Sequence, residues 1–212
     1  MKITQDVTKG ALHSAYAIGT FGAAKEELES KGYRVISLEE QAGLIVREGA
    51  TSSISQRGNW TREGFIYVPT KGIFLTRASS IMANAKEVTG PNRNSKWFHL
   101  NDEQVEKSLA DSAKITNTQI PTNRLADEAL TNFAFGRNAK AYGEFLEENG
   151  IDNLKVCLVH SQNQPFARQA WLHRIAEDNI SYLNGGKYPD DCYEVVRGVR
   201  ASAEEGLEKS EH

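Results

Sequence analysis

The chain has 212 residues, of which 39% are hydrophobic and 25% are charged, and this composition is typical of a globular protein. A chain of this length buries roughly 70% of the surface that it exposes when unfolded, so it needs no disulfide or metal ion to fold. No apolar run approaches the ~20 residues of a membrane-spanning helix, and the polar N-terminus lacks the apolar core of a signal peptide. We therefore expect a soluble cytoplasmic protein that does not bind membranes.

The net charge of −3 is distributed unevenly along the chain. Residues 1–50 carry a net charge of −1, and residues 101–212, with twelve basic and nineteen acidic residues, carry −7. Residues 51–100 contain seven basic and two acidic residues and carry +5. A nucleic acid or another anionic partner would be attracted to this central region.

The first segment with a clear pattern predicts a helix. Residues 11–31 place apolar side chains at helical spacing, and Gly32 follows as a typical helix end. Gly19 and Gly22 weaken the middle of such a helix, each by ~1 kcal/mol relative to alanine.

The next segments predict a first hairpin and a loop. Residues 33–38 and 44–47 are rich in strand-forming side chains and are separated by a short polar stretch. Residues 49–61 are small, polar and interrupted by glycine, which indicates a loop.

A second hairpin has the strongest local pattern in the chain. Residues 64–68 and 72–76 are rich in aromatic and β-branched side chains, and Pro69 and Gly72 bound the turn between them. Proline presets φ for entry into the turn, and glycine can adopt the positive φ that a bulge beside it requires. Together with the first hairpin, these strands predict an antiparallel meander over about residues 33–77, with one face available for helices.

The middle of the chain predicts helices. Asn101 is a good N-cap, and Gln104 stands at the capping-box position three residues later. The expected helices cover residues 81–88, 102–115, 125–135 and 138–148, and a loop is expected over residues 117–124.

The C-terminal third predicts a mixture of elements. Residues 154–159 form a compact apolar run that fits a buried strand, and residues 180–183 predict a short strand. Pro165 suits the first position of a helix that would extend to about residue 175. Residues 192–201 fit either a strand or a helix, and we favour a strand because Gly198 disfavours a helix.

The sequence motifs of common enzyme classes are absent. There is no phosphate-binding loop ending in GK[ST], no GxSxG and no HExxH, and the five histidines have no paired ligand spacing. Cys157 and Cys192 are expected to be inert thiols rather than a disulfide. We therefore expect neither a metal site nor a cofactor, and the sequence leaves open whether the protein is an enzyme.

Basic and aromatic residues gather in the central region. Cations can contact phosphates and flat rings can stack on bases, which is the pattern of a nucleic-acid-binding surface. Phe65 and Tyr67 alternate inward together and are expected in the core, whereas the tryptophans in polar segments are expected to be exposed. The expected nucleic-acid-binding residues are Arg57, Trp60, Arg62, Lys71, Arg77, Arg93, Lys96 and Trp97.

Two other functions compete with nucleic-acid binding. In the first, an enzyme or small-ligand binder has a polar site in the loop after residue 159, where His160, Arg77 and Lys71 would converge. In the second, a protein-interaction module without catalysis uses exposed tryptophans to bind a partner or a second copy of the chain.

We expect a single α+β domain over residues 1–212, with a boundary near residues 116–124 as the alternative. The expected architecture is a small antiparallel meander over about residues 33–77, packed by helices, with an additional buried strand near residues 154–159. The leading functional hypothesis is a small intracellular nucleic-acid-binding protein that uses the central hairpin.

Overall fold

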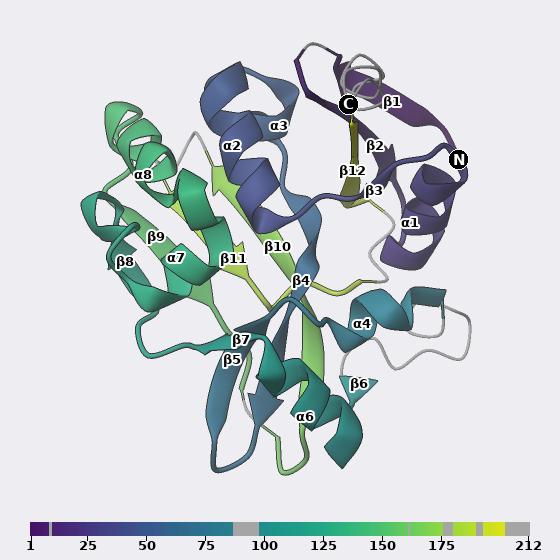
Figure 1. Cartoon of the computed structure of the whole chain (residues 1–212), viewed down its shortest axis with the longest axis vertical. Coiled ribbons are helices and arrows are strands. Elements are labelled where there is room, and N and C mark those ends of the chain that lie inside the picture. The colour runs from purple at the N-terminus through teal and green to yellow at the C-terminus, as the bar shows by residue number, and fades with distance from the viewer. Residues whose placement is uncertain (9, 87–97, 161, 176–179, 190–192, 202–212) are drawn as a thin grey trace, which may run out of the picture.

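The computed structural model describes residues 1–8, 10–86, 98–160, 162–175, 180–189 and 193–201. It contains a twelve-stranded sheet with helices packed against it (Figure 1). The strands are β1 (Ile3–Val7), β2 (Leu12–Ile18), β3 (Arg34–Val35), β4 (Asn59–Val68), β5 (Gly72–Thr76), β6 (Phe98–His99), β7 (Ser112–Lys114), β8 (Gln119–Pro121), β9 (Asn153–Cys157), β10 (Phe166–Ile175), β11 (Ile180–Asn184) and β12 (Val195–Ala201). The helices are α1 (Phe21–Ser30), α2 (Leu38–Glu48), α3 (Ser53–Gln56), α4 (Ser80–Ala83), α6 (Asp102–Ala110), α7 (Ala129–Phe135) and α8 (Ala139–Glu148), with the 3-10 turns η1 (Thr122–Arg124) and η2 (Gly136–Asn138). Within these ranges, no helix combines the length and the apolar character needed to cross a membrane.

The sheet is larger and more mixed than the predicted meander. Its main order is β1-β2-β12-β4-β10-β11-β9-β8, so strands from the two ends of the chain lie side by side. The pairs β12–β4 and β11–β9 are parallel, and the other neighbours in this order are antiparallel. Residues 33–77 contribute only β3, β4 and β5, because much of that stretch is helical. The division into domains stays a prediction.

Helices pack against both faces of the sheet. Figure 1 shows α2, α7 and α8 lying over the part of the sheet that contains β9, β10 and β11. Their buried side chains form one large core cluster, which includes Phe65, Tyr67 and Leu183. A second cluster contains Phe21 of α1, Trp60 of β4 and Ile81 of α4.

The β4–β5 hairpin confirms the second predicted hairpin. Val68 pairs with Gly72, and the register continues from there to Gly64 opposite Thr76. Gly72 has φ of +113°, as the turn chemistry predicts, and Thr70 also has a positive φ of +67°. Phe65 and Tyr67 lie in the same core cluster, as their alternation predicts.

The predicted helix over residues 11–31 is only half correct. Residues 12–18 form the strand β2, and the helix α1 begins after Gly19. β2 pairs with β1 on one side and β12 on the other, so tertiary pairing outweighs the helical spacing of Leu12, Ala15 and Tyr16. Gly32, with φ of +76°, follows the end of α1 as expected.

The first predicted hairpin is wrong, because its second strand is the helix α2. Ser37 caps this helix: its side chain accepts a hydrogen bond from the Glu40 backbone N–H, while the Glu40 side chain accepts one from the Ser37 N–H. This capping box was a readable signal in the sequence, and it stabilises the start of the helix. The predicted loop over residues 49–61 likewise contains α3 and the start of β4.

Several later elements follow the predictions. α6 begins after Asn101 with the expected capping box to Gln104, and α7, α8 and β11 lie within about four residues of their predicted positions. The predicted extension of α6 to residue 115 is wrong, because residues 112–114 form β7, which pairs with β5. Residues 195–201 form β12, which confirms the choice of a strand. Of the helix predicted over residues 81–88, residues 81–83 lie in α4, and residues 87–88 lie outside the described part of the chain.

The helix predicted after Pro165 is wrong. Residues 166–175 form β10, which pairs with β4 on one side and β11 on the other. Phe166 and Leu172 belong to one core cluster, and Ala167 and Trp171 belong to the other. Because both faces of β10 are buried, its apolar residues do not alternate along the sequence as those of a half-exposed strand would.

Glu63 of β4 provides a pH-dependent test of the fold. Its side chain is buried beside the first turn of α2, and one of its carboxylate oxygens accepts a hydrogen bond from the Leu38 N–H at 3.0 Å. Burial raises the pKa of Glu63, although the Leu38 hydrogen bond and the Arg62 charge oppose the shift. The contribution of Glu63 to the free energy of unfolding is therefore fully present below its unfolded pKa of about 4.3. This contribution is lost as the pH rises through the folded pKa. In urea denaturation from about pH 4 to pH 8, we expect the stability of the wild type relative to Glu63→Gln to fall.

Glu40 supplies a control of opposite sign. Burial acts to raise the pKa of Glu40, but hydrogen bonds from Arg34 and Ser37 outweigh it and lower the pKa. Its contribution is therefore present above about pH 4.3 and is lost as the pH falls through the folded pKa. If Glu63→Gln and Glu40→Gln showed the same pH dependence, the assignment for Glu63 would be wrong.

Candidate binding surface

The structure corrects the expected role of Trp60. Its side chain is fully buried, and its ring packs edge-to-face against Phe21 with 6.1 Å between ring centroids. The start of β4 lies between β12 and β10 in the interior of the sheet, so a side chain there meets the core rather than solvent. Trp60 therefore cannot stack on a base, whereas Arg93, Lys96 and Trp97 lie outside the described residues.

The four described cations of the predicted surface are exposed but do not converge. Arg57 precedes β4, and Arg62 lies beside α2, where its Nε is 3.5 Å from Glu63. Lys71 and Arg77 flank the two ends of β5 and are separated by about 20 Å along an extended strand. Arg77 also lies over the Phe133 ring, 4.2 Å from its centroid, and donates a 2.9 Å hydrogen bond to the Phe133 carbonyl.

Only part of the predicted polar site assembles. The loop after β9 reaches the hairpin, because the Val159 N–H donates a 3.1 Å hydrogen bond to the Tyr67 hydroxyl. A cavity of about 490 Å³ is lined there by Lys71 and Gln162, among other residues. His160 is exposed at the start of this loop, but Arg77 lies beyond the opposite end of β5. The three residues expected to converge are therefore not brought into one site.

Other candidates for chemistry find little support. Among the described residues, no group of three or more histidine, cysteine, aspartate or glutamate side chains could hold a metal ion. Cys157 is a free thiol whose pKa is raised by burial, which suits an unreactive side chain. Cys192 lies outside the described residues.

A different surface is formed by β9, β10 and β11. Along β9 and β11, buried and partly exposed side chains alternate strictly. Leu154 and Leu183, which are buried, point into the core below α7 and α8. Lys155 and Tyr182, which are partly exposed, therefore point to the opposite face of the sheet.

The strand register brings side chains together on this opposite face. His173 pairs with Tyr182, which in turn pairs with Lys155. In the next row, Trp171 pairs with Asn184, which pairs with Cys157. We call this surface the recognition face and define it by Lys155, His173, Tyr182 and Asn184, with the adjoining residues Lys187 and Tyr193 and the largely buried Trp171.

Trp171 and His173 form the least satisfied part of the recognition face. Their ring centroids are 4.6 Å apart, and neither Trp171 Nε1 nor His173 Nδ1 has a hydrogen-bond partner among the described residues. Gly58 makes room for the indole, because a Cβ atom at this position would lie 1.8 Å from the Trp171 ring. Burial lowers the pKa of His173, so the imidazole is neutral near pH 7 and can donate or accept a hydrogen bond.

The segment after β11 borders the recognition face and is held by Arg168. The buried Arg168 guanidinium donates hydrogen bonds to the carbonyls of Gly185 at 2.9 Å, Gly186 at 2.6 Å and Lys187 at 2.6 Å. Lys187 then lies 5.0 Å from the centroid of the Trp171 ring and forms a 2.5 Å ion pair with Glu194. This anchoring places backbone of irregular structure at a defined position beside the sheet.

Two tyrosines of this segment are unusually exposed. Tyr188 is 44% exposed and Tyr193 is 86% exposed. The sequence patterns identify neither tyrosine as a site residue, and they also miss Trp171 and His173, because residues 165–175 fit a helix. The two-residue spacing of Trp171 and His173, close to the predicted strand over residues 180–183, is the signal that could have found those two.

Comparisons with known proteins identify the fold of the chain but do not indicate an activity. No protein-family model matches the chain, and no curated protein matches its sequence. A solved structure described as "Accommodation of massive sequence variation in Nanoarchaeota by the C-type lectin fold" is similar, with a TM-score of 0.66 and 13% sequence identity, covering 93% of this chain and 100% of that chain. At this identity the likeness shows the fold alone, and the chain has a C-type lectin-like fold.

The alternation on β9 and β11 predicts a sharp difference in tolerance to substitution. Lys155→Ser and Tyr182→Ser, on the recognition face, should each change the free energy of unfolding by about 1 kcal/mol or less. Leu183→Ala, one residue further on but on the core face, should cost about 2–5 kcal/mol. Urea denaturation of the three variants measures this difference, and equal losses for Tyr182→Ser and Leu183→Ala would contradict the assigned faces.

Proposed function

We propose that this protein is a non-catalytic binding protein that recognises a protein partner through the recognition face. The observation that carries the proposal is that the partly exposed His173 and Tyr182 lie side by side on paired strands, with the exposed Tyr193 beside them next to Glu194, which pairs with Lys187. Aromatic side chains supply large contact areas at a low cost in conformational entropy, and they are enriched at the centres of protein interfaces.

The construction of the recognition face supports the proposal. Lys155, His173, Tyr182 and Asn184 project from β9, β10 and β11 on the face opposite the large core cluster. Substitutions at these four partly exposed positions leave that cluster intact, whereas Trp171 belongs to the second core cluster. The similar solved structure is described as a C-type lectin fold that accommodates massive sequence variation. A binding function suits such a surface, because its chemistry can change while its scaffold does not.

The test compares matched surface variants. Proteins captured by the wild type are purified and titrated individually by calorimetry against the wild type, Tyr182→Ser, Tyr193→Ser and Lys140→Ser. Lys140 is the control, because it is exposed on α8, which packs on the opposite face of the sheet. We expect at least about tenfold weaker binding for Tyr182→Ser or Tyr193→Ser and no change for Lys140→Ser. A partner whose affinity is insensitive to both tyrosine variants would refute the proposal.

Nucleic-acid binding through the central hairpin stays a prediction, and the same proteins can test it. Titrations with labelled single-stranded and duplex nucleic acid at two salt concentrations would include an alanine variant of all four described cations, Arg57, Arg62, Lys71 and Arg77. Binding that weakens with salt and is lost in this variant would favour the hairpin hypothesis over ours. Our proposal predicts no such binding.

A further inference from the structure

A second site lies on the side of the sheet that α2 covers, away from the recognition face. The residues around α2 enclose a pocket of about 360 Å³, which is within the size range of small-ligand sites. Its walls come from β2, α2, β4 and η2. We call it the α2 pocket and define it by the six polar residues that the argument uses: Glu39, Glu40, Arg47, Arg62, Arg137 and Asn138.

Close packing between α2 and η2 builds one wall of the pocket. Asn138 donates a 2.8 Å hydrogen bond from its side-chain amide to the carbonyl of Glu39. Gly43 allows this approach, because a Cβ atom there would lie 2.7 Å from the Asn138 amide nitrogen. The pocket is therefore formed by elements that contact one another directly rather than by a loose surface depression.

Three arginines line the α2 pocket. Arg47 is directed toward β2, because its Nη2 lies 3.4 Å from the Leu12 carbonyl and its Nε donates to Glu48 at 2.6 Å. The side chains of Arg62 and Arg137 are 46% and 90% exposed. Arg62 and Arg137 therefore carry guanidinium hydrogen-bond donors that can be reached from solvent.

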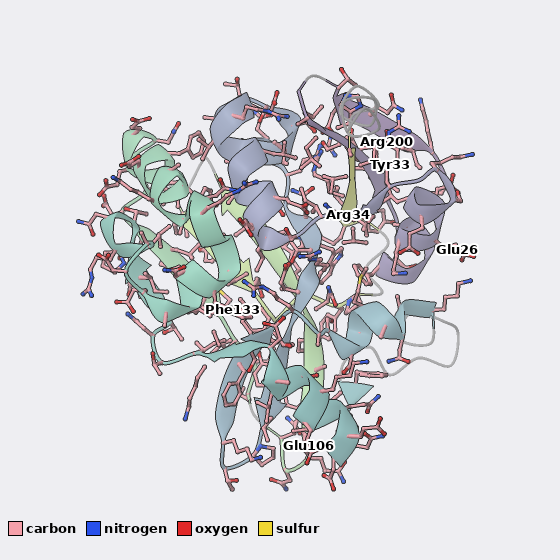
Figure 2. All side chains as sticks on the ribbon, viewed as in Figure 1. Glu26, Tyr33, Arg34, Glu106, Phe133 and Arg200 are labelled. Atoms are coloured by element: carbon pink, nitrogen blue, oxygen red, sulfur yellow. The ribbon has the colours of Figure 1, made fainter. Side chains whose placement is uncertain are left out.

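The acidic neighbours do not satisfy these two guanidinium groups. Arg62 is 3.5 Å from the buried Glu63, and Arg137 is 3.6 Å from Glu39, whereas a strong charge-assisted hydrogen bond measures about 2.7–2.9 Å. Glu40 is fully engaged elsewhere, because it pairs with Arg34 and completes the capping box of α2. Arg34 is labelled in Figure 2, where it lies beside α2.

We propose that the α2 pocket binds a small molecule through an oxyanion, a phosphate or carboxylate group, held by Arg62 and Arg137. The planar guanidinium group presents paired N–H donors that match the geometry of both oxyanions. Glu39 competes with the ligand for Arg137 and therefore weakens the affinity of the α2 pocket for the ligand.

The test uses the thermal unfolding midpoint of the intact chain with inorganic phosphate, acetate or chloride at matched ionic strength. We expect a saturable rise of about 3–6 °C at a phosphate or acetate concentration of roughly ten times Kd, and none with chloride. A larger effect of phosphate identifies a phosphate-bearing ligand, and a larger effect of acetate identifies a carboxylate. An equal rise with all three salts, or no rise, overturns the proposal.

Substitutions in the α2 pocket test whether the anion binds there. Arg62→Gln and Arg137→Gln should each weaken binding at least about tenfold, whereas Glu39→Gln should strengthen it by about two- to fivefold. Arg124→Gln is the matched control, since Arg124 is an exposed arginine with a glutamate 3.4 Å away, outside the pocket. If the arginine variants fail to fold, the sign of the Glu39→Gln effect still decides, and unchanged or weaker binding in that variant overturns the proposal.

Discussion

Replacing Arg168 with alanine is expected to destabilise the protein by at least about 3 kcal/mol and to release the segment that borders the recognition face. Arg168 is almost completely buried on β10, and its guanidinium satisfies the carbonyls of Gly185, Gly186 and Lys187. A buried acceptor left without a donor costs about 1–3 kcal/mol, and alanine would leave all three carbonyls without theirs unless water enters. Urea denaturation gives the loss of stability, and limited proteolysis of the segment after β11 reports its release.

Arg200→Ala is the control for the loss of an arginine as such. Arg200 is exposed on β12 and lies over the ring of Tyr33, with its guanidinium carbon 4.6 Å from the ring centroid (Figure 2). A cation–π contact at an exposed site contributes about 0.5–1 kcal/mol, so this variant should lose no more than that. Comparable losses in Arg168→Ala and Arg200→Ala would show that Arg168 does not anchor the segment.

The second large loss of stability is expected at the buried ion pair that joins β1 to β12. Arg197 of β12 is fully buried, and its Nη1 forms a 2.5 Å ion pair with Asp6 of β1 and a 3.1 Å hydrogen bond to Ser14. Its Nε donates to Asn59 at 3.0 Å, so one side chain links β1, β2, β4 and β12. Burial lowers the pKa of Arg197, and Asp6 opposes that shift, which is the relation expected of a buried cation held by a carboxylate.

Asp6→Ala should therefore destabilise the protein by about 3 kcal/mol, because it leaves the buried guanidinium without its counter-charge. Arg197→Met replaces the cation by an apolar side chain of similar length, and an apolar replacement for a buried ion pair is often neutral. We expect the double variant Asp6→Ala/Arg197→Met to be more stable than Asp6→Ala alone by at least about 1 kcal/mol. A double-mutant cycle from urea denaturation measures this coupling, and strictly additive losses would contradict it.

Elements whose signals are local can be predicted from the sequence. The β4–β5 hairpin follows from its turn residues, and the start of α6 follows from Asn101 and Gln104, because each depends on contacts within a few residues. The same reasoning could have found α2, whose Ser37–Glu40 capping box is written in the sequence but was outweighed by β-branched residues further on. Even the correct choice of a strand for β12 used only the composition of its own segment.

Elements and surfaces that depend on distant partners are set by tertiary pairing, which the sequence patterns do not show. β2 and β10 are strands because each has a hydrogen-bonded neighbour on both sides, and burial on both faces of β10 removed the alternation that would have marked it. Trp60 follows a polar stretch of sequence, yet the fold buries its side chain in the core. Lys155, Tyr182 and His173 lie in one row only because β9, β10 and β11 pair in one particular register. The register of a sheet is set by the packing of its buried face, and no pattern within a single strand can show which residues of other strands will lie beside it.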